Sequence, residues 1–163
     1  MMLVYIGLGS NLDNPLQHIQ TAIHDLRSVE GTRVVAVSSL YQSPPMGPPD
    51  QPDYVNAVVS LETALTPHQL LDLLQSIEQL HGRERKRHWG ERTLDLDILL
   101  YGEQTLSDDR LKIPHPGMLE RAFVLYPLAE IAPNIEIPGA GKLQEVLSSC
   151  TQGDLEKIDM MSL

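Results

Sequence analysis

The chain has 163 residues, 42% of them hydrophobic and 21% charged, which is typical of a folded globular protein and excludes an intrinsically disordered one. A chain of this length can form one domain with a substantial hydrophobic core. The formal net charge of −10 disfavours nonspecific binding to nucleic acid or anionic membrane, and the single cysteine, Cys150, excludes an intrachain disulfide or a thiolate metal cluster.

Six secondary-structure elements are predicted along the first 101 residues. Stretches rich in Val, Ile and alternating apolar residues predict strands, and apolar residues at a spacing of three and four predict helices. Asn14 with Pro15, and Thr66 with Pro67, are typical of helix starts. In chain order we expect a strand over 4–8 ending in a turn at Gly9-Ser10-Asn11, a helix from Pro15 to before Gly31, strands over 33–41 and 54–62, a helix from Pro67 to before Gly82, and a strand over 93–101.

This β-α-β-β-α-β order is that of the ferredoxin-like arrangement. A short extended piece over 111–114, a helical region over 118–132 and a helix over 143–147 follow it, and they predict a C-terminal helical elaboration of the core. The chain contains no internal repeat, low-complexity tract or linker. We therefore expect a single α+β domain over residues 1–163.

A proline-rich stretch over 43–53 interrupts this pattern. It contains five prolines, which lack a backbone N–H and fix φ, so it can be neither a helix nor a central strand. A stiff loop of this length within a compact domain is usually functional or disordered.

Asp95 and Asp97 form the most informative polar pair. Residues i and i+2 of a strand point the same way, with Cα atoms about 6.5 to 7 Å apart, and two such carboxylates repel each other unless a cation lies between them. Oxygen ligands with room for water and phosphate suit magnesium. An isolated Asp-x-Asp pair more often faces solvent on an edge strand. Here the opposite face of the predicted strand is aliphatic, with Leu94, Leu96, Ile98 and Leu100.

Basic residues gather immediately before this strand. Five of the twelve Lys and Arg residues fall within ten positions: Arg83, Arg85, Lys86, Arg87 and Arg92. By charge alone this stretch could be a polyanion site or a solvated loop. Next to a carboxylate pair it favours a metal–polyphosphate site, because carboxylates bind the metal and guanidinium groups bind phosphate oxygens. Phosphoryl transfer needs mainly such positioning and charge neutralisation.

The segment Trp-Gly-Glu-Arg-Thr-Leu-Asp-Leu-Asp-Ile over 89–98 resembles the signature of the 6-hydroxymethyl-7,8-dihydropterin pyrophosphokinase family. Three other stretches resemble the same family in the same order: Gly9-Ser10-Asn11, the segment over 47–56, and the segment over 114–133. The resemblance covers nearly the whole chain.

The resemblance implies a ferredoxin-like monomer that transfers pyrophosphate from ATP to the hydroxymethyl group of 6-hydroxymethyl-7,8-dihydropterin, in folate biosynthesis. The pterin hydroxyl would attack the β-phosphorus of ATP, and AMP would leave. Two magnesium ions would be held by Asp95 and Asp97.

Roles for individual residues also follow from the resemblance. The catalytic residues would be Arg83, Arg92, Asp95 and Asp97. ATP would be surrounded by Gln75, Glu78, Arg85, Ile98, Leu111, Lys112, His115 and Arg121. The pterin pocket would comprise Ser43, Pro44, Met46, Tyr54, Asn56, Trp89 and Phe123. Trp89 and Phe123 are the only residues of their kinds and could sandwich a flat heterocycle. Pro116 stands where some members of the family carry a tyrosine.

Two alternatives belong to other classes. Another two-metal nucleotidyltransferase on a ferredoxin-like fold would release pyrophosphate instead of AMP. An RNA-recognition domain shares the strand order, but such sheets are usually basic and carry aromatic residues on their middle strands. We expect small-molecule substrates and neither a nucleic-acid nor a membrane partner. The N-terminal residues lack a basic region and a long apolar run, so we expect a cytoplasmic protein.

Overall fold

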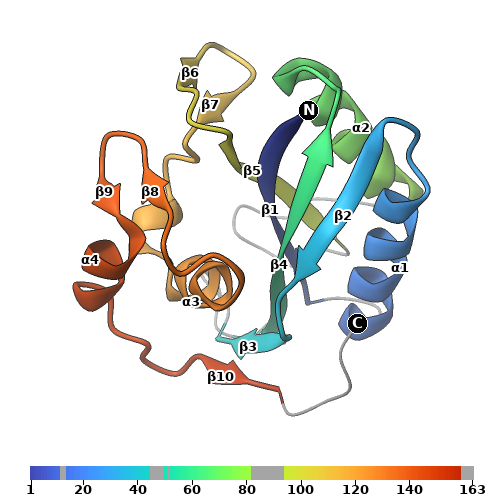
Figure 1. The fold of residues 1–163 in the computed structure, drawn as a ribbon. Coiled ribbons are helices and arrows are strands. Elements are labelled where there is room, and N and C mark those ends of the chain that lie inside the picture. Colours follow the sequence, from blue (N-terminus) through green and yellow to red (C-terminus); the bar gives the residue numbers. More distant parts are fainter. Residues whose placement is uncertain (12–13, 45–49, 51, 82–93, 159–163) are drawn as a thin grey trace.

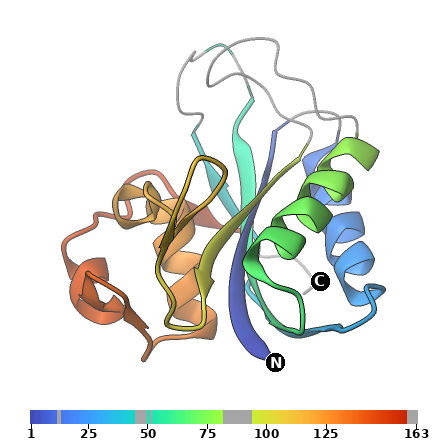
Figure 2. The same ribbon diagram turned by 90° about the horizontal axis from the view of Figure 1, so that it is seen from above.

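The computed structural model describes residues 1–11, 14–44, 50, 52–81 and 94–158. An antiparallel sheet lies between two groups of helices (Figure 1, Figure 2). Helices α1 (Pro15–Arg27) and α2 (Pro67–Leu80) cover one face, and α3 (Ala122–Ile131) covers part of the other, with α4 (Leu143–Ser148) beside it. The prediction of an α+β fold is confirmed.

The main sheet has the strand order β10 (Glu156–Lys157), β3 (Tyr41–Ser43), β4 (Tyr54–Thr63), β1 (Met2–Ser10) and β5 (Asp95–Tyr101), and β2 (Thr32–Val37) also pairs with β4. Every pairing in it is antiparallel. Strand β4 is long enough to pair with β3 near its start and with β2 near its end.

The single strand expected over 33–41 is wrong, because two serines interrupt it between β2 and β3. The hydroxyl of Ser38 accepts a hydrogen bond from the Val58 N–H at 2.9 Å, and it donates to the carbonyl of Ser39 at 2.8 Å. Serine side chains compete with the backbone for ladder hydrogen bonds in this way. The N–H of Ser39 then donates to a side chain of α3, at Glu130.

The turn expected at Gly9-Ser10-Asn11 is also wrong in its position. Strand β1 continues to Ser10, which pairs with Val55 of β4, so Gly7 and Gly9 lie inside the strand. The side-chain amide of Asn11 then donates to the carbonyl of Pro52 at 2.9 Å, which joins the end of β1 to the proline-rich segment.

Strand β5 contains an irregularity that changes which residues face which core. Its pairing with β1 passes from Tyr5↔Leu100 directly to Ile6↔Ile98, so Leu99 is an extra residue, as in a β-bulge. Leu100 therefore packs in the core under α3, on the opposite side from Ile98. The prediction that Leu100 shares a face with Leu94, Leu96 and Ile98 is wrong for this reason.

The two helices on the first face begin differently. Thr66 and Gln69 form a capping box at the start of α2, with side chain and backbone bonding in both directions. Asn14 precedes α1 in a left-handed conformation (φ 68°) and makes no side-chain cap hydrogen bond, contrary to the expectation that it caps this helix.

The C-terminal part contains more strand than predicted. Two short hairpins, β6 (Leu106–Ser107) with β7 (Lys112–Ile113) and β8 (Glu136–Ile137) with β9 (Gly141–Lys142), accompany the helices. The helical region expected over 118–132 divides at Arg121 into a 3-10 turn, Met118–Glu120, and α3. The helix expected over 143–147 is confirmed as α4. None of the helices within the described residues has the length and apolarity to span a bilayer.

Candidate active site

A cleft opens on the face of the sheet that α3 partly covers. It encloses about 760 Å³ of empty space, which includes open solvent. Strands β1, β3, β4 and β5, the segment after β7 and the start of α3 all contribute to it. Its described lining residues are Gly7, Leu8, Gly9, Ser43, Pro44, Tyr54, Asn56, Ala57, Asp95, Asp97, Leu99, His115, Arg121, Phe123 and Val124.

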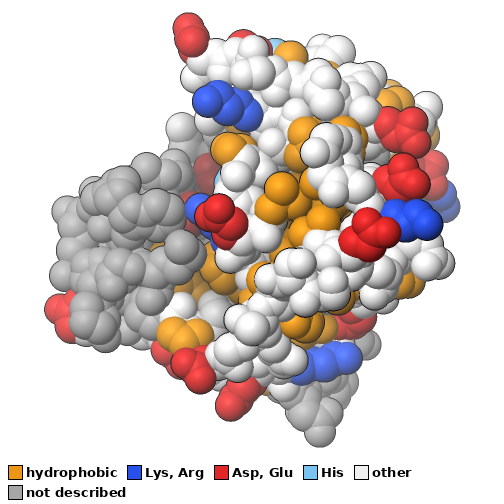
Figure 3. Space-filling model, turned by 90° about the vertical axis from the view of Figure 1, so that its left-hand side faces the viewer, with side chains coloured by type: hydrophobic (Ala, Val, Ile, Leu, Met, Phe, Trp, Pro, Cys, Tyr) orange, Lys and Arg blue, Asp and Glu red, His pale blue; other side chains and the backbone are white. Residues whose placement is uncertain are grey.

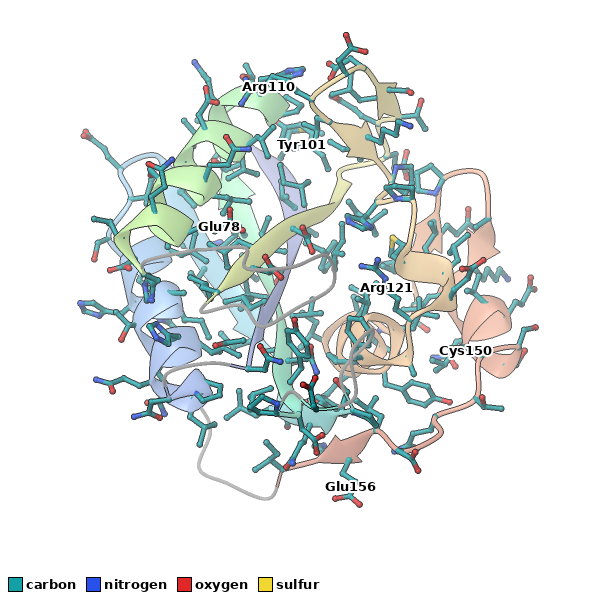
Figure 4. All side chains as sticks on the ribbon, turned by 180° about the vertical axis from the view of Figure 1, so that it is seen from behind. Glu78, Tyr101, Arg110, Arg121, Cys150 and Glu156 are labelled. Atoms are coloured by element: carbon teal, nitrogen blue, oxygen red, sulfur yellow. The ribbon has the colours of Figure 1, made fainter. Side chains whose placement is uncertain are left out.

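Asp95 and Asp97 lie on the cleft side of β5, and the side chain of Asp97 is 48% exposed. Leu96 points the other way into the core under α1 and α2. Its N–H lies on the outer edge of β5 and donates to the buried carboxylate of Glu78 at 2.8 Å (Figure 4). The backbone between the two aspartates is thus held from both sides, by β1 and by α2.

His115 lies beside this pair because of the bulge in β5. The His115 N–H donates to the carbonyl of Leu99, the extra residue, at 3.1 Å. Nδ1 of its ring accepts from the Gly117 N–H at 3.1 Å, so the proton of the neutral ring is on Nε2, which lies 4.0 Å from Oδ1 of Asp97. Burial lowers the pKa of His115; Asp97 opposes that shift and Arg121 adds to it. The ring is therefore held as a neutral donor.

Ser43 and Asn56 form a buried polar pair at another part of the cleft. The Asn56 amide donates to the Ser43 hydroxyl at 2.8 Å, and both residues are at most 5% exposed. The Oδ1 atom of Asn56 lies 3.4 Å from the position that a Cβ on Gly9 would occupy. The pair can offer an amide oxygen, a second amide hydrogen and a hydroxyl hydrogen to a ligand.

Arg121 and Phe123 line the cleft from the start of α3, and Figure 4 shows the Arg121 side chain there. The guanidinium carbon of Arg121 lies 5.8 Å from the centroid of the Phe123 ring, within cation–π distance. A Cβ on Gly117 would lie 2.9 Å from that guanidinium carbon, so glycine leaves the space that this side chain occupies. A cationic group and an aromatic face are thus presented together.

The cleft brings together nine of the residues predicted for the site: Asp95, Asp97, His115, Arg121, Ser43, Pro44, Tyr54, Asn56 and Phe123. Five others lie outside the described residues: Met46, Arg83, Arg85, Trp89 and Arg92.

Five predicted ATP residues do not line the described cleft. Ile98 and Leu111 belong to the core under α1 and α2. Gln75 and Lys112 are exposed, and the Gln75 amide oxygen lies 3.4 Å from an Arg110 nitrogen. Glu78 is bonded to the backbone of β5. Their contacts with ATP remain predictions.

The sequence reasoning missed Gly7, Gly9 and Leu99 as parts of the site. The two glycines leave the cleft side of β1 without side chains, and a Cβ on Gly7 would meet Leu99 at 3.4 Å. Glycine at alternate positions of an otherwise apolar strand was the available signal, since such residues mark a close approach of another group. No local signal marked the bulge at Leu99.

Figure 3 shows hydrophobic side chains gathered on one face of the molecule, with acidic side chains around them. Within the described part of the chain no group of three or more His, Cys, Asp or Glu side chains is arranged to hold a metal. Asp95 and Asp97, two carboxylates on the cleft side of β5, remain the predicted metal ligands.

Comparison with known proteins adds independent information. Residues 5–133 match the model of the 7,8-dihydro-6-hydroxymethylpterin-pyrophosphokinase (HPPK) family. The chain is 52% identical to the 2-amino-4-hydroxy-6-hydroxymethyldihydropteridine pyrophosphokinase of Pseudomonas aeruginosa, over 95% of this chain and 96% of that protein. It is 46% identical to the enzyme of the same name from Haemophilus influenzae, over 98% and 99% of the two chains.

Solved structures share the fold. The HPPK-DHPS protein of Plasmodium falciparum, crystallised with pteroate, matches 91% of this chain with a TM-score of 0.71 and 14% identity. The match covers 42% of that longer chain. A second structure, of HPPK-DHPS in complex with substrates, gives a TM-score of 0.72 at 13% identity, again over 91% of this chain and 43% of the other.

Proposed function

This chain belongs to the 7,8-dihydro-6-hydroxymethylpterin-pyrophosphokinase family, and from that premise we propose how its cleft serves the family's reaction. The enzyme transfers pyrophosphate from ATP to the hydroxymethyl group of 6-hydroxymethyl-7,8-dihydropterin, a step of folate biosynthesis. A bond forms between the pterin hydroxyl oxygen and the β-phosphorus, the hydroxyl loses its proton, and AMP leaves with the oxygen that bridged the α- and β-phosphorus atoms. The observation that carries the assignment of the site is the cleft that joins a carboxylate pair to a polar and aromatic pocket.

We infer that Asp95 and Asp97 hold two magnesium ions. Their carboxylates lie on one face of β5, in the cleft, and oxygen ligands with room for water suit magnesium. Bound magnesium would neutralise charge on the phosphates and orient them. The hydrogen bond from the Leu96 N–H to the Glu78 carboxylate and the pairing of β5 with β1 keep the carboxylates of Asp95 and Asp97 on this face.

The pterin pocket is proposed to lie between β3, β4 and α3. Ser43 and Asn56 present donors and an acceptor side by side, which suits the amide-like edge of a pterin. Phe123 offers a ring face for the flat heterocycle. Pro44 and Tyr54 add to the described wall, and Met46 and Trp89, outside the described residues, are proposed to complete it.

The phosphates are proposed to lie between the carboxylate pair and the basic residues. Arg121 and the neutral His115 ring, which carries its proton on Nε2, both reach the cleft and can donate to phosphate oxygens. Arg83 and Arg92 are proposed to act on the transferred phosphates, as the family resemblance implies. Such donors matter most when they stabilise charge that develops during transfer.

The architecture is proposed to be a single ferredoxin-like domain. The strand order β5-β1-β4, with β2 and β3 on the far side of β4 and both α1 and α2 on one face, supports that description. We also propose that the enzyme is monomeric and cytoplasmic.

Product identification tests the function. The protein is incubated with ATP, Mg²⁺ and 6-hydroxymethyl-7,8-dihydropterin, and the nucleotide product is separated. AMP formed in equal amount with pterin pyrophosphate is expected, and it should be lost in Asp97→Ala. Release of inorganic pyrophosphate instead of AMP would identify nucleotidyl transfer and overturn the proposal.

A further inference from the structure

The proposed pterin pocket has two walls, on β3 and α3, that backbone pairing does not join. Ser43 belongs to β3 and Phe123 belongs to α3, and both line the pocket. Among the described residues no backbone hydrogen bond joins α3 to β3. Side-chain contacts must therefore determine how far apart these walls lie.

Glu130, near the end of α3, makes the polar contacts that join the two walls. One carboxylate oxygen accepts from both the N–H and the hydroxyl of Ser39, each at 2.8 Å. The other accepts from the phenol of Tyr41 at 2.6 Å. Hydrogen bonds to an ionised acceptor are stronger than those between neutral groups. One side chain of α3 thus holds the segment that leads directly into β3.

The contact with Ser39 lies in the interruption between β2 and β3. The N–H of Ser38 still donates to the Val58 carbonyl of β4 at 2.9 Å, whereas the N–H of the next residue, Ser39, points to α3. A carboxylate at position 130 gives this N–H a charged acceptor. The interruption and the glutamate therefore work together.

Tyr41 connects Glu130 to the residues of the pocket. Tyr41 and Ser43 are both buried and lie on the same face of β3, because residues i and i+2 of a strand point the same way. Tyr41 is also paired in register with Asn56, the partner of Ser43. A shift of Tyr41 would move the polar pair of the pocket.

Contacts with other elements matter more for the position of α3 than for that of an uninterrupted helix. Pro127 lies inside it and has no N–H, so the carbonyl of Phe123, four residues earlier, receives no helical hydrogen bond from it. The position of the Phe123 end thus depends on what the rest of the helix contacts. Glu130 supplies such a contact one turn after the proline.

The C-terminal strand adds a third element at the same point. Lys157 of β10 lies 3.7 Å from Glu130, and β10 pairs with β3 at Tyr41 and Gln42 (Figure 1). Because the side chain of Lys157 is 56% exposed, this ion pair should add little. The backbone pairing nevertheless closes the outer edge of β3.

We propose that Glu130 is a positioning residue for pterin binding: it holds β3 and α3 at the separation at which Ser43 and Phe123 both line the pocket. The proposal rests on the pterin pocket proposed above. Glu130 itself acts through Tyr41 and Ser39, which hold β3, and does not touch the substrate.

The test compares Glu130→Ala, Glu130→Gln and Tyr41→Phe with the control Glu145→Gln, an exposed glutamate on α4. Binding of the pterin is measured by calorimetry in the presence of Mg²⁺ and a nonhydrolysable ATP analogue, and steady-state constants are measured for both substrates. We expect Glu130→Ala to weaken pterin binding about tenfold, and Glu130→Gln and Tyr41→Phe about threefold each. Binding of the ATP analogue should change less than about twofold, and the pterin KM should rise with little change in kcat, as for an interaction equally strong in ground and transition states.

Coupling between the residues provides a readout that general destabilisation would not give. Adding Tyr41→Phe to Glu130→Ala should weaken pterin binding by less than about twofold more, because both changes break the same contact. If Glu130→Ala does not fold, Glu130→Gln and Tyr41→Phe decide the question. Unchanged pterin affinity in folded Glu130→Gln and Tyr41→Phe variants, or equal losses for pterin and ATP, would overturn the proposal.

Asn56→Ala separates this inference from the pocket assignment. If Asn56→Ala weakens pterin binding but the Glu130 and Tyr41 variants do not, the pocket stands and the positioning role is wrong. If Asn56→Ala also leaves pterin binding unchanged, the proposed pocket itself is wrong, and the positioning role fails with it.

Discussion

Removing the carboxylate of Glu78 should destabilise the strand that carries both aspartates. Strand β5 lies at the end of the strand order, so the N–H of Leu96 faces away from β1 and donates to Glu78 at 2.8 Å. Glu78 is 6% exposed and Leu96 is 4% exposed, so water is a poor substitute for this acceptor. Hydrogen bonds to charged groups contribute about 1.5–3 kcal/mol, and a buried N–H left without a partner costs about 1–3 kcal/mol.

We therefore expect Glu78→Ala to lower the free energy of unfolding by about 2–3 kcal/mol. For a domain of this size that corresponds to a fall in Tm of about 4–12 °C. Glu78→Gln keeps an amide oxygen as acceptor and should cost about 1 kcal/mol. Gln79→Ala, at an exposed neighbouring position on α2, is the matched control.

Urea unfolding and amide hydrogen exchange together measure the effect. Glu78→Ala should speed exchange of the Leu96 amide more than that of amides in β4, since the loss is local to β5. Turnover should also fall, because the backbone between Asp95 and Asp97 is less firmly held. A Tm within about 1 °C of the wild type, with unchanged protection of Leu96, would refute the reasoning.

Three further outcomes are expected. Asp95→Ala and Asp97→Ala should each abolish AMP formation. Each should leave the Tm measured without magnesium unchanged or higher, because each removes a like-charged neighbour. Retained turnover in either variant would remove the metal-ligand assignment. Phe123→Leu should raise the KM for the pterin about three- to tenfold, with little change in the KM for ATP, because ring stacking is lost. Equal changes in the two KM values would contradict a contact specific to the pterin. Burial acts to raise the pKa of Glu130, but hydrogen bonds from Tyr41 and Ser39, with the nearby Lys157, lower it overall from its usual 4.5. The stabilisation that ionised Glu130 provides is thus complete above pH 4.5 and is lost as the pH falls through the lowered pKa. Glu130→Gln should therefore flatten the loss of stability between about pH 5 and pH 3 in acid titrations monitored by circular dichroism. An unchanged slope would count against the contact.

The placement of the carboxylate pair was predictable because it depends on local periodicity. Asp95 and Asp97 alternate with Leu94, Leu96 and Ile98, and burial of the aliphatic face is enough to direct both carboxylates to the other side. The starts of α1 and α2 and the α+β class followed from equally local signals. Ser43, Asn56 and Phe123, by contrast, were predicted from the resemblance to a family and not from any pattern in these residues alone.

The departures from prediction that shape the site involve partners far apart in the sequence. The bulge at Leu99 is defined by pairing with β1, and it brings the backbone of His115 to β5 and its ring to Asp97. No pattern within residues 95–101 distinguishes a bulged strand from a regular one, because either keeps leucines buried. The alternation therefore failed at Leu100, once the register shifted.

What the sequence by itself determined was the type of most elements, the face on which the two aspartates lie and the chemistry of the residues available for the site. Only the tertiary structure decided that the strand is interrupted between β2 and β3, that Glu130 accepts a hydrogen bond from the N–H of Ser39, and that β10 pairs with β3. The physical reason is the range of the interactions involved. Periodicity and capping depend on neighbours within a few residues, whereas the contact between Ser39 and Glu130 joins residues 91 positions apart and forms only when both cores are packed.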